Sequence, residues 1–366
     1  MTAAGWRDED TERFAALLTN YCLDVQPGWQ VLVRSTTLAA PLLRALHAAI
    51  LERDAWPLLR SELPGVEEDF LALARERHLD SFGSIAEAEA AHADAFLSIQ
   101  APFNTRALAD ADPAALARMA RSRAPLTELR MTKRWCGTLW PTPAGAQQAG
   151  MSDDAFGAFV RGALFLDRDD PAAAWRELGA FQAALIERLA DARELRIEAP
   201  GTDLTLRVNG RTWANSDGRR NMPSGEVFTG PIENSANGTI RFTVPSSPRG
   251  VAVENVELTF RDGEVVEARA SRGDDYLQRT LATDPGARRL GEIGIGTNSG
   301  IDRSIGAILF DEKIGGTVHL ALGRSYPETG GVNESAVHWD LICDLREGGR
   351  LTADGEVVQE GGVFAS

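Results

Sequence analysis

Two short segments near the C-terminus carry side chains that could bind metal ions. One is the run 317–323, which contains His319, and the other is His338, Trp339 and Asp340. Aliphatic and β-branched residues dominate both segments, and glycine pairs separate them, which predicts strands. Side chains two apart on a strand point the same way, so His338 and Asp340 share a face and Trp339 lies on the other. This pair suits a metal, although a structural histidine bonded to an aspartate has the same pattern.

Two glutamates occupy unusual surroundings for a charged side chain. Glu226 lies in the run 223–231 and Glu292 in the run 290–298, both of them apolar, strand-like and bounded by glycine. Burying a carboxylate costs free energy unless the group is paired or binds a metal, so each glutamate needs a partner if its run is buried. An exposed glutamate on an edge strand is the alternative for either residue.

Four ordered motifs connect these residues to a known family. The motifs are residues 221–229, 312–323, 326–328 and 338–340, and together they resemble the M29 family of thermophilic aminopeptidases, the group of aminopeptidases T and S. Weaker similarity reaches back to residues 28–60, 141–143 and 149–152. The resemblance implies a homodimer, a dinuclear metal site and a catalytic tyrosine that matches Tyr326. The implied metal ligands are Glu226, Glu292, His319, His338 and Asp340.

The expected function is therefore that of a metal-dependent aminopeptidase. Three carboxylates and two imidazoles suit two divalent ions about 3.5–4 Å apart, and such donors admit Zn, Co, Mn or Mg. The ions would activate a water that releases N-terminal amino acids from peptides with a free N-terminus. Tyr326 would donate a hydrogen bond to the oxyanion, although an ordinary turn also accounts for a tyrosine here. Glu292 is the expected bridging ligand and could carry a proton, and Glu312 is a weaker candidate for supporting the ligands.

Two other functions are compatible with the same residues. The first is hydrolysis of a different C–N bond by an amidase that has the same metals. The second is a non-catalytic binding protein that retains the fold. The presence of all five ligand types together with Tyr326 argues against the second alternative, whereas only a panel of substrates separates the first from an aminopeptidase.

Length and composition restrict the class of protein. A chain of 366 residues exceeds one ordinary core, which predicts two domains, and 43% hydrophobic with 25% charged residues is typical of a globular protein. A net charge of −15 disfavours nucleic acid as a partner. The first ten residues show no signal-peptide pattern, and no apolar run approaches ~18 residues, so we expect a cytoplasmic protein without a membrane span.

The first part of the chain, residues 1–193, is expected to be an α/β domain. Strand-like and helix-like segments alternate, which is typical of a mainly parallel sheet with right-handed crossovers. The predicted strands cover residues 30–34, 56–60, 95–99 and 135–140. The predicted helices cover residues 8–23, 41–53 and 67–77, with others that begin after Asp112, after Ser152 and at Pro171.

The second part, residues 194–366, is expected to be a β-rich α+β domain that holds the metals. Its apolar runs are short and broken by glycine, asparagine and proline, with hairpin turns predicted at residues 209–210 and 262–263. All five implied ligands lie in this part, which places the domain boundary near residue 193.

Two further features bear on the site. The glycine-rich segment 294–300 lacks the spacing of a dinucleotide loop and the lysine of a P-loop, so we expect no nucleotide cofactor and interpret the glycines as allowing close approach to a metal centre. Only two of the 38 basic residues are lysines, Lys133 and Lys313. Because Lys313 lies six residues before His319, we expect its compact ammonium near the metals, with chance retention at a surface turn as the alternative.

Overall fold

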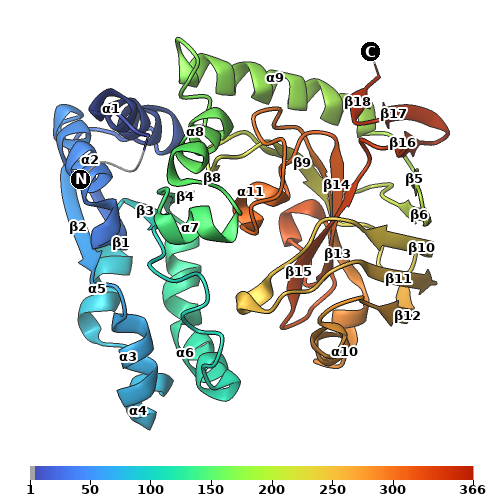
Figure 1. Cartoon of the computed structure of the whole chain (residues 1–366), viewed down its shortest axis with the longest axis horizontal. Helices are drawn as coiled ribbons and strands as arrows, with labels where there is room; N and C mark the ends of the chain where they lie inside the picture. Colours follow the sequence, from blue (N-terminus) through green and yellow to red (C-terminus); the bar gives the residue numbers. More distant parts are fainter. Residues whose placement is uncertain (1–4, 366) are drawn as a thin grey trace. The chain divides into compact units, whose positions relative to one another are not determined.

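The chain divides into two units, each with its own sheets (Figure 1). The computed structural model describes residues 5–365. The first unit comprises Met1–Ala172 and Gly218–Pro223, and the second comprises Ala173–Asp217 and Ser224–Ser366. The second unit thus includes most of the helix that the sequence analysis assigned to the first domain, because this helix contributes Leu185 and Leu189 to the second unit's core. The domain boundary near residue 193 stays a prediction.

A five-stranded parallel sheet forms the centre of the first unit, as predicted. Its strand order is β2-β1-β3-β4-β8, and every neighbouring pair is parallel. The strands are β1 (Gln30–Thr36), β2 (Trp56–Glu62), β3 (Ala95–Gln100), β4 (Arg134–Leu139) and β8 (Asn221–Met222). The last strand was not predicted, since it is two residues long and belongs to the segment that returns from the second unit.

Helices connect β1 to β4 in the way that parallel pairing requires. They are α2 (Ala40–Glu52), α3 (Val66–Leu73), α4 (Glu76–Asp80), α5 (Ser84–His92) and α6 (Pro113–Met131). Helix α1 (Asp8–Ala16) precedes β1, and α7 (Pro143–Gln148) and α8 (Asp153–Ala163) follow β4. The side chain of Ser152 caps α8, as predicted, and that of Asp112 caps α6, which begins after Asp112 as expected. The helix predicted over 67–77 is two helices, because the backbone at Ala74 is extended and His78 Nδ1 accepts a hydrogen bond from the Arg75 N–H to start α4.

The second unit contains one long helix and two antiparallel sheets. The helix is α9 (Pro171–Leu189), and two short helices follow at α10 (Asp274–Leu281) and α11 (Ile308–Asp311). The eight-stranded sheet has the order β12-β11-β10-β6-β5-β16-β17-β18. Its strands are β5 (Glu194–Ala199), β6 (Thr202–Arg207), β10 (Asn237–Phe242), β11 (Val256–Arg261), β12 (Glu264–Arg269), β16 (Arg350–Ala353), β17 (Glu356–Glu360) and β18 (Val363–Phe364).

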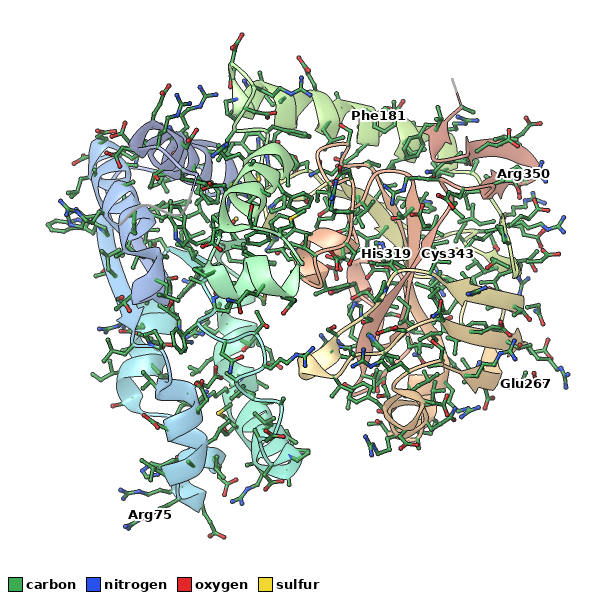
Figure 2. The ribbon with its side chains drawn as sticks, viewed as in Figure 1. Arg75, Phe181, Glu267, His319, Cys343 and Arg350 are labelled. Carbon is green, nitrogen blue, oxygen red and sulfur yellow. The ribbon has the colours of Figure 1, made fainter. Side chains whose placement is uncertain are left out.

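The five-stranded sheet of this unit holds the predicted ligands. Its order is β15-β14-β13-β9-β7. The strands are β7 (Ala214–Ser216), β9 (Glu226–Thr229), β13 (Leu290–Gly296), β14 (Thr317–Gly323) and β15 (His338–Asp344). Figure 2 shows His319 and Cys343 on two of these strands, β14 and β15.

One core lies between the two sheets of the second unit. Alternate residues of β13, β14 and β15 enter it, and they are Ile293, Ile295, Val318, Leu320, Leu322, Trp339, Leu341 and Cys343. Residues of the eight-stranded sheet, such as Ile197 and Phe260, complete the same cluster. Period-two alternation therefore turns one face of the five-stranded sheet to the core and leaves the other face for polar side chains.

The two predicted hairpin turns differ in outcome. Asp262 and Gly263 join β11 to β12, and both have positive φ, as a two-residue hairpin turn requires. Asn209 and Gly210 form a turn but no hairpin, because the strands on either side of them, β6 and β7, belong to different sheets. Among the described residues, no helix combines the length and the apolar character that a membrane span needs.

Candidate metal centre

The predicted ligands come from four neighbouring strands of one sheet. Glu226 begins β9, Glu292 lies in β13, His319 lies in β14, and His338 and Asp340 begin β15. Cross-strand partners project from the same face of a sheet. The partners of the ligands are small, since Glu226 pairs with Gly296, His319 with Gly294, Asp340 with Ala321 and His338 with Gly323. The five side chains therefore share one face, and the small partners leave space between them.

Gly294 makes room for the imidazole of His319. A Cβ atom at position 294 would lie 2.1 Å from Cε1 and 2.2 Å from Nε2 of His319, closer than any real contact. The ring thus occupies the space that a side chain on β13 would take. The glycines of this segment were predicted to allow close approach at a metal centre, and at this position the approaching group is the side chain of a predicted ligand rather than backbone.

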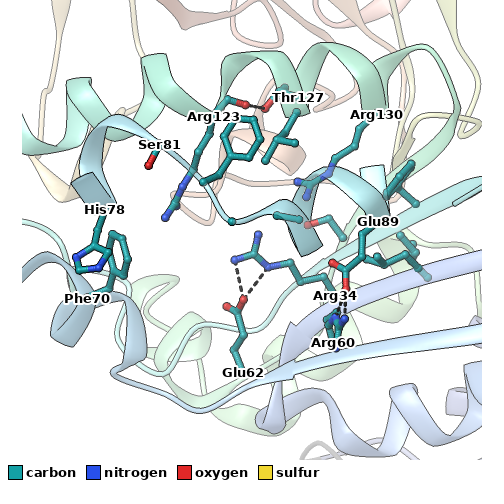
Figure 3. Close-up of a pocket in the computed structure, with 18 of the residues that line it drawn as sticks. Arg34, Arg60, Glu62, Phe70, His78, Ser81, Glu89, Arg123, Thr127 and Arg130 are labelled. Atoms are coloured by element: carbon teal, nitrogen blue, oxygen red, sulfur yellow. Dashed lines mark hydrogen bonds and ion pairs between the residues drawn. The ribbon is translucent and has the colours of Figure 1, made fainter. Parts of the chain in front are cut away.

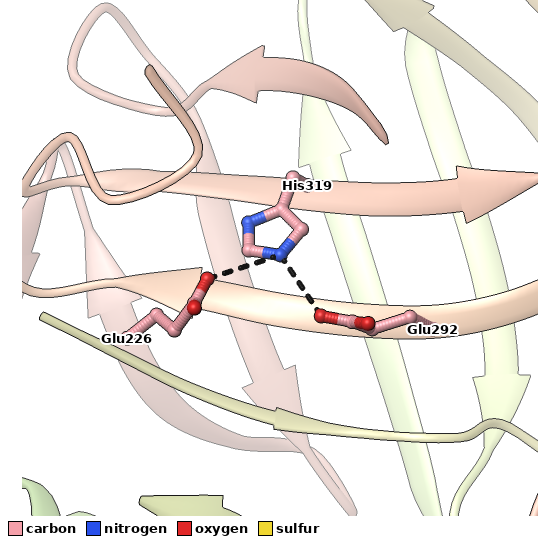
Figure 4. Close-up of side chains that lie close together, drawn as sticks. All are labelled: Glu226, Glu292 and His319. Carbon is pink, nitrogen blue, oxygen red and sulfur yellow. Dashed lines mark hydrogen bonds and ion pairs between the residues drawn. The ribbon is translucent and has the colours of Figure 1, made fainter. Parts of the chain in front are cut away.

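The first group of donors is buried and convergent (Figure 4). His319 is fully buried, and its Nε2 atom lies 3.3 Å from Oε1 of Glu292 and 3.4 Å from Oε2 of Glu226. Each residue offers one donor atom, and the three donor atoms lie within 4.8 Å of one another. Both glutamates are 5% exposed, so the expectation that they are buried carboxylates is confirmed and the edge-strand alternative is excluded.

The second group shares a residue with the first. Glu292, His338 and Asp340 also offer donor atoms within 4.8 Å of one another. His338 Nε2 lies 3.6 Å from Asp340 Oδ1 and 3.8 Å from Glu292 Oε2. On the other side of the ring, Nδ1 lies 2.8 Å from the carbonyl oxygen of Arg324. A carbonyl only accepts, so neutral His338 carries its proton on Nδ1 and turns the Nε2 lone pair to the carboxylates.

Electrostatics at the site favour a cation. Burial raises the pKa of Glu226 to about 7 and also raises the pKa of Glu292. Burial alone would lower the pKa of His319, but its hydrogen bond to Glu292 and the nearby carboxylates outweigh burial and raise it to about 9. Burial thus makes the ionised carboxylates costly, and their charges favour the protonated form of the imidazole. Both shifts indicate that positive charge beside the carboxylates stabilises the site.

Lys313 is the cation that the chain itself supplies. Its side chain is fully buried, its Nζ lies 3.4 Å from Oε1 of Glu226, and it also forms an ion pair with Glu312. Burial lowers the pKa of the ammonium, but the attraction of Glu226 and Glu312 exceeds that effect and raises the pKa. The expectation that Lys313 lies near the ligands is confirmed, and the alternative of a surface turn is wrong.

Tyr326 follows β14 on the loop that leads into a short 3-10 turn, Pro327–Thr329. Its ring packs edge-on against His338, with ring centroids 5.1 Å apart, and at a tilt against Phe228, with ring centroids 5.7 Å apart. Burial, followed by the charges of Glu292 and Asp340, raises the pKa of its hydroxyl. That hydroxyl has no hydrogen-bond partner within the described part of the chain. Tyr326 therefore stays protonated beside the ligands and is free to donate.

Sequence reasoning missed a supporting residue on α9. Gln182 is fully buried, and its Nε2 donates to the backbone carbonyl of Glu226 at 2.7 Å and to that of Ser216 at 3.3 Å. It fixes the start of β9 and thereby the position of the Glu226 side chain. The sequence signal that could have identified Gln182 is its place as a single polar residue on the buried side of a helix. The other buried residues of that helix are Trp175, Leu185 and Leu189.

A second residue that sequence reasoning missed is Asn298, which contacts the backbone around Gly225, the residue before Glu226. Asn298 Nδ2 donates to the carbonyl of Ser224 at 2.9 Å. Gly225 has a φ of +113°, and a Cβ atom there would lie 2.7 Å from Cβ of Asn298. Only glycine fits this conformation and this space, so the backbone on both sides of Gly225 is fixed before Glu226 enters the sheet.

Comparisons with known proteins place this chain in a family. A sequence model of the thermophilic metalloprotease family (M29) matches residues 7–364. Aminopeptidase 2 of Geobacillus stearothermophilus is 33% identical over 402 aligned residues, covering 95% of this chain and 95% of that protein. The solved structure of wild-type AmpT from Thermus thermophilus superposes with a TM-score of 0.84 at 25% identity, covering 98% of this chain and 99% of that one.

A match over nearly the whole chain defines the protein as a metalloprotease. The chain belongs to the thermophilic metalloprotease family M29, as the four motifs predicted. The predicted enzyme class, a metal-dependent hydrolase of peptides, is confirmed with it. A solved structure of 2,5-dihydroxypyridine dioxygenase from Pseudomonas putida KT2440 also covers 99% of this chain with a TM-score of 0.60, but at 15% identity this likeness concerns the fold alone.

Proposed function

We propose that the protein is an aminopeptidase that uses two divalent metal ions to hydrolyse the N-terminal peptide bond of its substrates. The observation that carries this proposal is the geometry of the two donor groups, which have Glu292 in common. One carboxylate that belongs to both groups can bridge two ions. The names of the relatives, Aminopeptidase 2 and AmpT, support a peptide substrate with a free N-terminus.

The side chains present fit divalent metals. The Oε2 atom of Glu226 and the Nδ1 atom of His319 are buried without a hydrogen-bond partner among residues 5–365. A buried carboxylate oxygen in that state costs free energy that a bound cation would offset. Glu226 and His319 would hold one ion, His338 and Asp340 the other, and Glu292 both. When bound, such ions act as Lewis acids and make water acidic enough to serve as a nucleophile near neutral pH.

Three residues of the chain would then assist the reaction. Tyr326 keeps its proton because its pKa is raised, so its hydroxyl can donate to the oxyanion that forms at the scissile carbonyl. Glu292 can carry the proton from the attacking water to the leaving amine. Lys313 would hold Glu226 in place or position the substrate carbonyl, and Glu312 would support Lys313 through their ion pair. The surplus of carboxylates suits the free amine of the substrate as an anchoring group.

A single preparation of the purified protein tests the proposal. Metal content should approach two ions per chain by mass spectrometry, and a peptide with a free N-terminus should be shortened from that end. The N-acetylated form of the same peptide is the matched control and should remain intact, because its N-terminal group can no longer bind as an amine. Zero metal would remove both enzyme functions, and equal cleavage of the two peptides would favour an amidase or an endopeptidase.

The identity of the metal, the oligomeric state, the cellular location and the domain division are also part of this proposal. We expect Zn, Co, Mn or Mg as the metal, a homodimer, a cytoplasmic location and two domains that divide near residue 193. Light scattering after size-exclusion chromatography tests the homodimer, and metal reconstitution of the apoprotein with each ion in turn ranks the metals.

A further inference from the structure

A cavity of about 760 Å³ lies in the first unit (Figure 3). It covers the face of the parallel sheet that carries Arg34 of β1, Glu62 of β2 and Ser98 of β3, and helices α3 to α6 form its other walls. Its volume falls in the range of about 300–1,000 Å³ that small-molecule sites occupy. It contains none of the proposed metal ligands, so it is a separate feature of the molecule.

The charge of this cavity is opposite to that of the whole chain. The chain has a net charge of −15, yet five arginines and only two glutamates line the cavity. Arg34 Nη2 lies 2.7 Å from Glu62 Oε1, and Arg60 pairs with Glu89. The remaining three arginines, at positions 77, 123 and 130, have no carboxylate within ion-pair distance among the described residues. The cavity therefore holds an uncompensated positive charge.

Two of these arginines are held in place by aromatic rings. The guanidinium of Arg123 lies 5.1 Å from the ring centroid of Phe70, and that of Arg130 lies 5.7 Å from the ring centroid of Phe96. Such contacts orient a planar guanidinium without neutralising it. Figure 3 shows the guanidinium groups of Arg34, Arg123 and Arg130 directed into the same space. They are therefore positioned before any ligand arrives, which reduces the entropy lost on binding.

Burial and mutual repulsion make the arrangement costly without an anion. Burial lowers the pKa of both Arg123 and Arg130, and the charge of Arg34 lowers each of them further. The Nε–H of Arg130 is buried and has no hydrogen-bond partner in the described part of the chain. An unsatisfied buried donor on a charged group costs free energy, and an anion placed there would offset it.

We propose that this cavity binds a small organic anion whose phosphate or carboxylate oxygens bridge Arg123, Arg130 and Arg34. The guanidinium fork presents paired N–H donors that match either oxyanion, and Leu32, Leu126 and Phe96 offer apolar wall for the rest of the molecule. Long polyanions such as nucleic acids are disfavoured, because the positive groups converge on one pocket and the net charge of the chain repels them.

The test uses the full-length protein and two probes, inorganic phosphate and succinate, that separate the two sources of oxyanion. Calorimetric titration should show saturable one-to-one binding of at least one probe. Arg123→Gln and Arg130→Gln should each weaken that binding at least tenfold. Arg121→Gln is the matched control, since Arg121 is an exposed residue of the same helix outside the cavity, and it should leave the binding unchanged.

The outcomes decide the proposal and its chemistry. Binding of phosphate alone assigns a phosphorylated ligand, binding of succinate alone assigns a polycarboxylate, and binding of both assigns recognition of the shared charge. Failure of both probes to saturate, or equal affinities in all three variants, would overturn the proposal, as would binding at the metal centre, which is indifferent to Arg123 and Arg130. Hydrogen exchange on the wild-type protein gives a second readout, since the probe should protect cavity-lining segments within residues 32–130 and nothing else.

Discussion

Replacing Lys313 by methionine tests how the chain balances charge at the metal centre. The two side chains have similar length, so the variant removes the ammonium and little else. Lys313 is fully buried, and Glu226 beside it is 6% exposed in its side chain. Removing one partner of a buried ion pair leaves an uncompensated charge and costs about 3–5 kcal/mol. We expect the metal-free variant to lose about that much of its free energy of unfolding at pH 8.

The loss should depend on pH, and the sign follows from Glu226. Burial already raises the pKa of Glu226 to about 7, and without Lys313 the pKa rises further. A carboxyl whose folded pKa exceeds its unfolded pKa contributes stability that is present at low pH and is lost as pH rises through the folded value. The variant should therefore be less destabilised at pH 6, where Glu226 takes up a proton, than at pH 8.

Chemical denaturation of the metal-free protein at both pH values measures these losses. Lys313→Arg adds volume at a site without space, so it should cost about 1–3 kcal/mol and lower kcat/KM at least about tenfold in the metal-loaded protein. Lys133→Arg is the matched control at the chain's other lysine, where the change should stay within about 0.5 kcal/mol. Wild-type stability and wild-type kcat/KM in Lys313→Arg would refute this account of the site.

The other predictions concern the proposed ligands, Tyr326 and the loss of activity at low pH. Alanine at Glu226, His319 or Asp340 should abolish metal retention and cleavage of aminoacyl substrates, as mass spectrometry and a chromogenic assay would report; full activity in any variant removes that residue from the site. Tyr326→Phe should lower kcat by about 10²–10³ with metal content unchanged, and loss of metal would instead make Tyr326 structural. Because metal binding needs neutral histidine and ionised carboxylates, activity should fall below about pH 6 and return when metal is added after neutralisation; an acid optimum would contradict this.

Much of the fold could be predicted because local sequence determines it. The strand β1 contains the apolar run 31–33, which is buried as expected for a strand of a parallel sheet, and Pro171 marks the first residue of α9. Asp262 and Gly263 have the two positive φ values that their hairpin needs. In each case the physical cause lies within a few residues, which is the range that periodicity and turn chemistry describe.

Other parts of the fold depend on partners distant in sequence. The break between α3 and α4 rests on the ring of His78, a polar residue that fits a continuous helix equally well. The two residues of β8 form a strand only because β4 lies beside them. The turn at Asn209 and Gly210 joins strands of different sheets, and the turn sequence alone contains no information about sheet membership.

The candidate site likewise has features that local sequence predicts and features that depend on residues distant in sequence. Its five proposed ligands were found through motifs, and Trp339 was correctly turned to the opposite face from His338 and Asp340 by period-two alternation. The pairing of His319 with Gly294 and the support of Glu226 by Gln182 were not predictable, because both depend on long-range register. A cavity lined by arginines from two strands and two helices likewise has no signature in the linear sequence.

The strip of small residues between the ligands has a consequence for how the enzyme matures. The proposed ligands span residues 226–340 and meet only after β9, β13, β14 and β15 have paired. That pairing closes long loops, so we expect the site to form late in folding. A slip of one residue in any pairing would send a proposed ligand toward the apolar core and a leucine or isoleucine toward the proposed metal site. With this ligand set, metal uptake would act as a checkpoint on strand register, and a misassembled chain would remain without metal and inactive.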